Sequence, residues 1–182
     1  MKIYTRRGDS GETGIWGGAR LPKDDLRIEA VGSVDECNAA IGAAIAEGVP
    51  DFAGKVLAIV QNNLFVVGSD LIAPNHTGSG TTVRRINGED IARLEAEIDN
   101  FEATLPELRN FILPGGTRAG SHVHLARAVC RRAERQVTAL NRATPVGAPL
   151  LAYLNRLSDL LFVVARYVNA SNGVVDVVWG GR

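Results

Sequence analysis

The stretch RIEAVGSVDECNAAIGAAIAE, residues 27–47, decides the fold class. Residues that share one face of a helix recur in it at three- and four-residue steps: Val31, Val34, Asn38, Ile41 and Ile45. This spacing is that of an amphipathic α-helix. Gly48 and Pro50 follow directly, and both residue types are typical of a helix end. We therefore predict a helix over residues 27–47.

The same periodicity predicts four further helices, over about 51–71, 87–101, 117–142 and 149–170. Asn87 is expected to cap the third of the five helices, because Glu89 and Asp90 follow it where a helix N-terminus favours negative charge. Residues 73–86 are rich in Gly, Ser and Thr and indicate a surface loop. Pro106 and the turn 114–116 bracket a connector.

Five helices with short connections predict an all-α fold, an up-and-down five-helix bundle of the ferritin-like kind. A length of 182 residues fits one domain. Within this domain we expect an irregular N-terminal loop segment over 1–26, the helical bundle over 27–170 and a tail over 171–182. Residues 174–179 have the length of a short strand, but no partner strand is expected, so they are assigned to the tail.

The charge balance excludes some classes of partner. Twenty Lys and Arg residues balance twenty Asp and Glu residues, which argues against a general nucleic-acid or membrane-surface binder. The sequence has no run of about 18 apolar residues and no apolar signal core at its N-terminus. Cys37 and Cys130 lie far apart in the sequence, so we expect reduced thiols. These features predict a cytoplasmic protein without a nucleic-acid or membrane partner.

The segment TRRGDSGETG, residues 5–14, is the first candidate site. Its three glycines let backbone N–H groups approach an anion, and its hydroxyl groups add donors. Arg6, Arg20 and Lys23 would supply positive charge for a polyphosphate. The segment is not a P-loop, because the Gly-Lys-Ser/Thr ending and the preceding strand are missing. A phosphate-binding loop and a flexible polar arm both remain open.

Arg127, Arg131 and Arg135 fall four residues apart on the fourth predicted helix and therefore line one stripe of it. Like charges at this spacing destabilise an isolated helix, so something negative should compensate for them. Asp35 on the first helix is a candidate partner. A solvated face that pairs with acids of neighbouring helices and a binding site for a polyanion both remain open.

Three smaller groups contain residue types that could carry chemistry. Asn155 and Asp159 share one face of an apolar helix, which is typical of a partly buried polar site or of bonds between helices. Phe111 lies on the connector beside two glycines, either as a core plug or as a lid over a pocket. His122 and His124 point in nearly opposite directions on a helix, so they cannot chelate one metal ion.

Four stretches occur in a specific order: YTRRGDSGET (4–13) with Arg20 and PKDD (22–25); VGSVDECN (31–38) with IG (41–42); FILPGG (111–116) with ARAVCRRAER (126–135); and YLNRLSD (153–159). With these stretches the chain resembles the ATP:cob(I)alamin adenosyltransferases of the trimeric helical-bundle, PduO-type family. The resemblance covers nearly the whole chain. Any one stretch alone is a weak signal, and the four together are highly specific.

The resemblance implies a homotrimer in which ATP, carrying Mg²⁺, lies between neighbouring subunits. It assigns two groups of residues to ATP. The N-terminal group is Thr5, Arg6, Arg7, Gly8, Asp9, Thr13, Gly14 and Lys23. The helical group is Arg131, Arg132, Ala133, Glu134, Arg135 and Asn155. Ser10 stands where several family members carry Lys, which weakens one phosphate contact.

The resemblance also implies the reaction, in which Co(I) of cob(I)alamin attacks C5′ of ATP to form adenosylcobalamin and triphosphate. The catalytic residues would be Arg131, Asp35, Arg127 and Phe111. Asp35 and Arg127 would pair between subunits beside the corrin, and Phe111 would shield its lower face. A flavin-type reductase and an adenosylcobalamin-dependent acceptor enzyme are the implied partners. The alternatives are a non-catalytic bundle whose arginine stripe binds nucleic acid or an acidic partner and a sensor that binds ATP without turnover.

Overall fold

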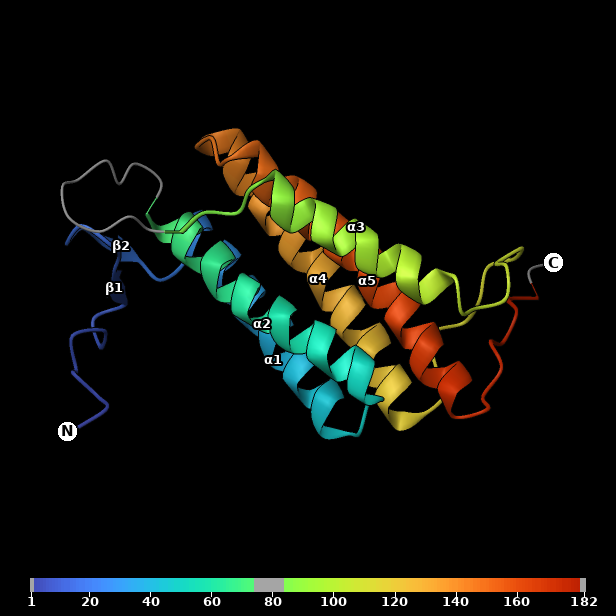
Figure 1. Cartoon of the computed structure of the whole chain (residues 1–182). Helices are drawn as coiled ribbons and strands as arrows, with labels where there is room; N and C mark the ends of the chain where they lie inside the picture. Colours follow the sequence, from blue (N-terminus) through green and yellow to red (C-terminus); the bar gives the residue numbers. More distant parts are fainter. Residues whose placement is uncertain (1, 74–83, 181–182) are drawn as a thin grey trace.

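The computed structural model describes residues 2–73 and 84–180. These residues form two short strands and five helices, with the bounds β1 Glu12–Gly14, β2 Arg20–Pro22, α1 Leu26–Ala46, α2 Asp51–Ile72, α3 Gly88–Glu102, α4 Arg118–Ala143 and α5 Ala148–Ser171. Figure 1 shows the helices side by side in a long bundle, with the N-terminal hairpin at one end and the C-terminal tail at the other. The predicted all-α five-helix fold is confirmed.

The helix ends follow local signals in the sequence. The Asp25 side chain accepts a hydrogen bond of 2.8 Å from the backbone N–H of Arg27 and so caps α1. After α1, Gly48 has φ 89°, in the left-handed region that glycine adopts freely. Asn87 and Asp90 form a reciprocal capping box at the start of α3, which confirms the predicted cap. The predicted loop 73–86 lies largely outside the described residues.

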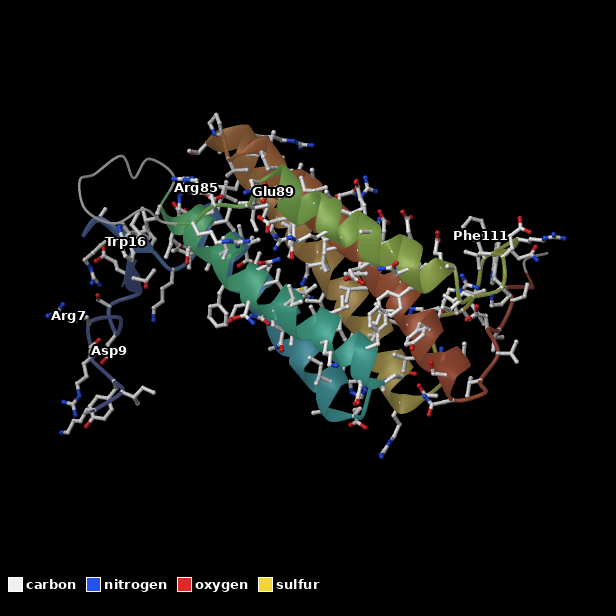
Figure 2. The ribbon with its side chains drawn as sticks, viewed as in Figure 1. Arg7, Asp9, Trp16, Arg85, Glu89 and Phe111 are labelled. Carbon is white, nitrogen blue, oxygen red and sulfur yellow. The ribbon has the colours of Figure 1, made fainter. Side chains whose placement is uncertain are left out.

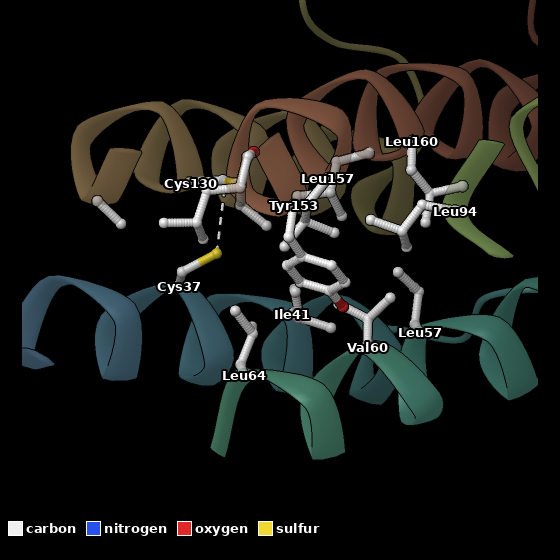
Figure 3. Packing of buried hydrophobic residues seen from close by; sticks show 14 of the residues in the cluster. Cys37, Ile41, Leu57, Val60, Leu64, Leu94, Cys130, Tyr153, Leu157 and Leu160 are labelled. Atoms are coloured by element: carbon white, nitrogen blue, oxygen red, sulfur yellow. Dashed lines mark hydrogen bonds between the residues drawn. The ribbon is translucent and has the colours of Figure 1, made fainter. Parts of the chain in front are cut away.

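The core lies where α4 packs on α1 and α5, while α3 covers α5 and α2 covers α1. Tyr153 and Phe101 are the largest fully buried side chains. Figure 3 shows Tyr153 among aliphatic side chains of α1, α2 and α5. Burial raises the pKa of the Tyr153 hydroxyl. Cys37 on α1 and Cys130 on α4 are free and buried, which agrees with the expectation of reduced thiols. Their Sγ atoms donate to the backbone carbonyls of Ala126, over 3.9 Å, and Leu154, over 3.4 Å.

Helices α2 and α5 are long and apolar enough to cross a membrane by length and composition alone, each with a mean hydropathy of 1.3. Of the most apolar 18-residue stretch of each helix, 39% is buried inside the bundle in α2 and 56% in α5. Core helices of a bundle have the same character, because they bury one apolar face against their neighbours. The expected absence of a membrane partner stays a prediction.

Two expectations about irregular segments need correction. Residues 12–22 of the N-terminal segment form an antiparallel hairpin, in which Thr13 pairs with Leu21. The tail also has a strand partner, because Ile112 of the connector forms an antiparallel bridge with Val178. These pairings escaped prediction because each strand has too few residues to show an alternating pattern.

Candidate functional site

A pocket of about 420 Å³ opens between α4 and α5. It is lined by Arg131, Glu134, Arg135, Thr138, Ala139, Arg142 and Asn155. The Asn155 amide donates a hydrogen bond of 3.1 Å to the Glu134 carboxylate, which joins the two helices across the pocket. The structure thus brings together four residues predicted for the site: Arg131, Glu134, Arg135 and Asn155.

The pocket carries an excess of positive charge. Arg131, Arg135 and Arg142 are exposed, and none of them forms an ion pair with another described residue. Glu134 is the one carboxylate in the lining, and Asn155 already binds it. Guanidinium groups form charge-assisted, often bidentate hydrogen bonds with phosphate oxygens. The pocket is therefore suited to a polyphosphate.

Arg142 was missed by the sequence analysis, although a signal was available. It follows Arg135 by seven residues, which is two helical turns, and so extends the same arginine stripe. Arg127, at the other end of the stripe, is not part of the pocket lining.

Two residues predicted for the site lie away from this pocket. Arg132 points to α1, where it forms an ion pair with Glu36. Ala133 is fully buried in the core. Helical geometry explains both positions, because residues adjacent in sequence project about 100° apart around the axis.

The N-terminal segment is an ordered loop with its own bonds. Arg20 donates from Nε to the Glu12 carboxylate over 3.1 Å and from Nη2 to the Arg7 carbonyl over 2.7 Å. The Lys23 N–H donates to the Gly11 carbonyl over 2.8 Å. At Gly8, an added Cβ would lie 3.3 Å from Lys23 Nζ, so the small residue allows the ammonium to come close. These contacts argue against the alternative of a flexible polar arm.

The N-terminal residues do not reach the pocket of their own chain. Among the described residues, no hydrogen bond or ion pair joins residues 2–23 to the pocket lining. Figure 2 shows Arg7 and Asp9 projecting beyond one end of the bundle, while Phe111 lies at the opposite end. A ligand that touches all of these residues would therefore need more than one copy of the chain.

Phe111 is not a core plug, because 79% of its surface is exposed. Its ring packs edge-on against Trp179 of the tail, with 6.3 Å between ring centroids. Two backbone bonds of 2.8 Å support this contact, from Trp179 N–H to the Phe111 carbonyl and from Leu113 N–H to the Val177 carbonyl. The structure therefore leaves the lid as the open alternative for Phe111.

Asp35 and Arg127 do not pair within one chain. Asp35 is exposed beside a groove of about 360 Å³ between α1 and α2, whose lining includes Leu64 and Phe65. Arg127 on α4 has a buried Nε atom that lacks a hydrogen-bond partner among the described residues. Buried polar atoms normally have a partner, and Asn38 Oδ1, His124 Nδ1 and Tyr153 Oη are likewise without one among the described residues.

The remaining polar candidates have structural contacts. Asp159 is exposed and pairs with Arg156 at 3.2 Å, so the Asn155–Asp159 face is not a partly buried site. His122 Nδ1 bonds to the Arg118 carbonyl at 2.9 Å. His124 is buried, and burial together with nearby Arg127 lowers its pKa, which Asp176 partly opposes. Among the described residues, no three side chains could hold a metal ion together.

Known proteins match this chain over almost its full length. A family model described as cobalamin adenosyltransferase matches residues 3–168. The corrinoid adenosyltransferase of Bacillus subtilis (strain 168) is 44% identical over 97% of this chain and 91% of that protein. The corrinoid adenosyltransferase of Mycobacterium tuberculosis (strain H37Rv) is 45% identical over 98% of this chain and 92% of that protein.

Solved structures agree with the fold. A PduO-type ATP:corrinoid adenosyltransferase from Lactobacillus reuteri, with a phenylalanine replaced by alanine, was solved with cobalamin and ATP. It has a TM-score of 0.91 and 36% identity and covers 99% of this chain and 100% of that chain. A variant of the same enzyme with an arginine replaced by lysine, complexed with ATP, has a TM-score of 0.88. These relatives and solved structures thus place the chain among the transferases. The chain belongs to the cobalamin adenosyltransferase family.

Proposed function

We propose that this chain transfers the 5′-deoxyadenosyl group of ATP to Co(I) of cob(I)alamin, forming adenosylcobalamin and releasing triphosphate. Co(I) supplies both electrons of the new cobalt–carbon bond and becomes Co(III). The bond between C5′ and its phosphate oxygen breaks, and triphosphate leaves with that electron pair. The observation that carries the proposal is the arginine-lined pocket between α4 and α5.

The chemistry needs positioning and charge stabilisation more than a base. Cob(I)alamin is already a strong nucleophile, so no side chain has to remove a proton. The leaving triphosphate gains negative charge, and preorganised guanidinium groups stabilise such charge. We assign this role to Arg131 and Arg135, with Arg142 at the far end of the pocket. Mg²⁺ would enter on the phosphates of ATP, since no three described side chains could hold a metal ion together.

A homotrimer with shared sites would explain why the N-terminal loop lies away from the pocket of its own chain (Figure 2) and why Arg127 Nε lacks a described partner. The N-terminal loop of one subunit would close over ATP in the pocket of its neighbour. Asp35 would pair across the interface with Arg127, which gives a partner to the buried Nε atom. Exposed apolar side chains on α2, Ile59 at 58% and Phe65 at 71%, would be covered by the neighbouring subunit.

The exposed ring of Phe111 would face the lower side of the corrin. An apolar wall there disfavours the axial base, and loss of that base makes Co(II) easier to reduce to Co(I). A flavin-type reductase would supply the electron, and an adenosylcobalamin-dependent enzyme would accept the product. The chain would work in the cytoplasm, without a nucleic-acid partner.

Subunit mixing tests the shared site directly. An arm variant, Lys23→Ala, and a pocket variant, Arg131→Ala, are co-expressed with two different tags, and doubly tagged oligomers are purified. Each variant alone should have little adenosyl transfer. Mixed oligomers should regain a measurable part of the wild-type rate, because some interfaces join an intact arm to an intact pocket. Mixed oligomers no more active than the two parents would contradict a site shared between subunits.

A further inference from the structure

Two buried polar side chains lie in the last turns of α5, next to the end of the bundle that carries Phe111. Arg166 is 4% exposed and Asn169 is 3% exposed. Buried polar groups cost free energy unless they are hydrogen-bonded. Both side chains find their partners outside the helix, in the connector and in the tail.

Arg166 joins the start of the connector to the tail. Its Nε donates to the Asp176 carboxylate over 2.7 Å, and its Nη2 donates to the Pro106 carbonyl over 2.9 Å. The Asp176 side chain is itself only 20% exposed. Removing one partner of an ion pair at this depth would leave a buried charge without compensation, which is strongly destabilising. Arg166 and Asp176 therefore fasten the tail to the bundle.

Asn169 holds the other end of the connector. Its Oδ1 accepts from the N–H of Thr117 over 2.9 Å and from the Thr117 hydroxyl over 3.0 Å. Its Nδ2 donates to the Gly115 carbonyl over 2.8 Å. A Cβ atom at Gly116 or Gly120 would overlap the Asn169 side chain, so both glycines leave the space that this contact needs.

Phe111 lies between these two attachment points, and its own side chain does not fix its position. The ring is mostly exposed and its one described ring contact is with Trp179 of the tail. The backbone around it is bonded to tail residues, from Leu113 to Val177 and from Trp179 to Phe111. The tail therefore sets where Phe111 lies.

We propose that Arg166 and Asp176 are positioning residues for Phe111. Their ion pair holds the tail against α5, and the tail holds Phe111 at a fixed height relative to the lower face of the corrin. The inference rests on the proposed function, in which Phe111 excludes the axial base. Arg166 and Asp176, which lie outside the arginine pocket, would thereby affect one step, the formation of base-free Co(II).

Two corrinoids separate this role from a general structural one. Cobalamin carries the lower axial base, whereas cobinamide lacks it and can place only weakly bound water at that position. A chain with a loosened Phe111 should therefore lose activity with cobalamin and keep it with cobinamide. The variant is Asp176→Asn in the full chain, and the matched control is Asp99→Asn, an exposed acid on α3.

The measurements are the fraction of base-free Co(II) in the presence of Mg-ATP, by electron paramagnetic resonance, and the adenosylation rate with a reductant. For Asp176→Asn we expect about a tenfold fall in both quantities with cobalamin and less than about a twofold change with cobinamide. Asp99→Asn should match the wild type with both corrinoids. Circular dichroism reports whether the helices are intact. If Asp176→Asn does not fold, a chain that ends at Gly173 removes the tail and should give the same contrast.

The outcomes distinguish this inference from the proposed function. Equal losses with cobalamin and cobinamide, or no loss with either, contradict the positioning role while leaving the proposed function in place. A wild-type chain that adenosylates neither corrinoid contradicts the proposed function and the positioning role together.

Discussion

The side chains of Asn155 on α5 and Glu134 on α4 are joined by a hydrogen bond of 3.1 Å across the arginine pocket. The bond uses Oε1 of Glu134, the one carboxylate in the pocket lining. Neither Arg131 nor Arg135 forms an ion pair with Glu134 or with another described carboxylate, so both guanidinium groups are available to an anion. The bond thus joins two residues 21 positions apart in sequence at the pocket between α4 and α5.

Arg142 should contribute to ATP binding, because its guanidinium lines the pocket and has no acidic partner among the described residues. Replacing it in Arg142→Ala removes a charge-assisted contact with phosphate, which in an exposed site is weaker than in a buried one. We expect the KM for ATP to rise about three- to tenfold with little change in kcat. Steady-state kinetics at saturating corrinoid measure this.

The control for Arg142→Ala is Arg93→Ala, which removes an exposed arginine on α3, outside the pocket. Both variants lower the net charge equally, so a general electrostatic effect would appear in both. An unchanged KM for ATP in Arg142→Ala would exclude this residue from the nucleotide site.

Asp35→Asn should impair the corrin step more than ATP binding. In the proposed trimer the substitution leaves the Arg127 guanidinium without its counter-charge beside the corrin. We expect about a tenfold lower rate with cob(I)alamin and an unchanged Kd for ATP. Stopped-flow absorbance and calorimetry measure the two quantities. Glu29→Gln, an exposed acid on the same helix, is the control, and a wild-type rate for Asp35→Asn would refute the pairing.

Much of the helical fold could be predicted because it depends on local signals. The spacing of Val31, Val34 and Ile41 marks α1, and Asn87 with Asp90 marks the start of α3. The bridge between Ile112 and Val178 could not be predicted in this way. Its two strands are short and distant in sequence, so their pairing depends on how α5 places the tail.

Site residues that lie on one helical stripe could be predicted from their spacing. Residues whose positions depend on contacts between helices could not. Arg131 and Arg135 lie in the pocket as their spacing implies, and the same spacing would have found Arg142. Arg132 is adjacent in sequence but turns to Glu36 on α1. Asn169 anchors the connector through residues more than 50 positions away in sequence, so no local sequence pattern could predict this contact.

Gly120→Ala should destabilise the fold, because the new methyl group would overlap the buried Asn169 side chain. Forcing an extra methyl group into a packed site costs about 1–3 kcal/mol in the free energy of unfolding. Gly54→Ala, on α2, would meet only ordinary contact with Val49, at 3.5 Å, and is the control. It should be neutral or stabilise α2 by up to about 1 kcal/mol.

Urea or thermal unfolding of the two glycine variants gives the comparison. If Gly120→Ala were as stable as Gly54→Ala, the close packing of Asn169 against the start of α4 would be disproved.

His124 should make the fold less stable as the pH falls. Burial lowers its pKa below the ordinary value of 6.5 in the folded chain, with a smaller contribution from Arg127. Below about pH 6.5 the unfolded chain therefore binds the proton first, and the folded state loses stability until the lower folded pKa is passed. His124→Gln should flatten the decline in unfolding free energy between about pH 7 and about pH 5.

The decline is measured by urea titrations at several pH values, and the slope is compared with that of the wild type. The absolute stability of His124→Gln is not the test, since a buried amide has its own cost. A slope identical to that of the wild type would show that His124 is not the group that titrates.

Adenosyl transfer by this chain can be followed in an anaerobic absorbance assay. Chemically generated cob(I)alamin and Mg-ATP are mixed with the protein, and the Co(I) band is followed. We expect loss of this band, formation of a light-sensitive cobalt–carbon product and release of triphosphate, with a much lower rate for Arg131→Ala. An unchanged Co(I) band in the presence of bound ATP would contradict it and would identify the chain as an ATP-binding protein without turnover.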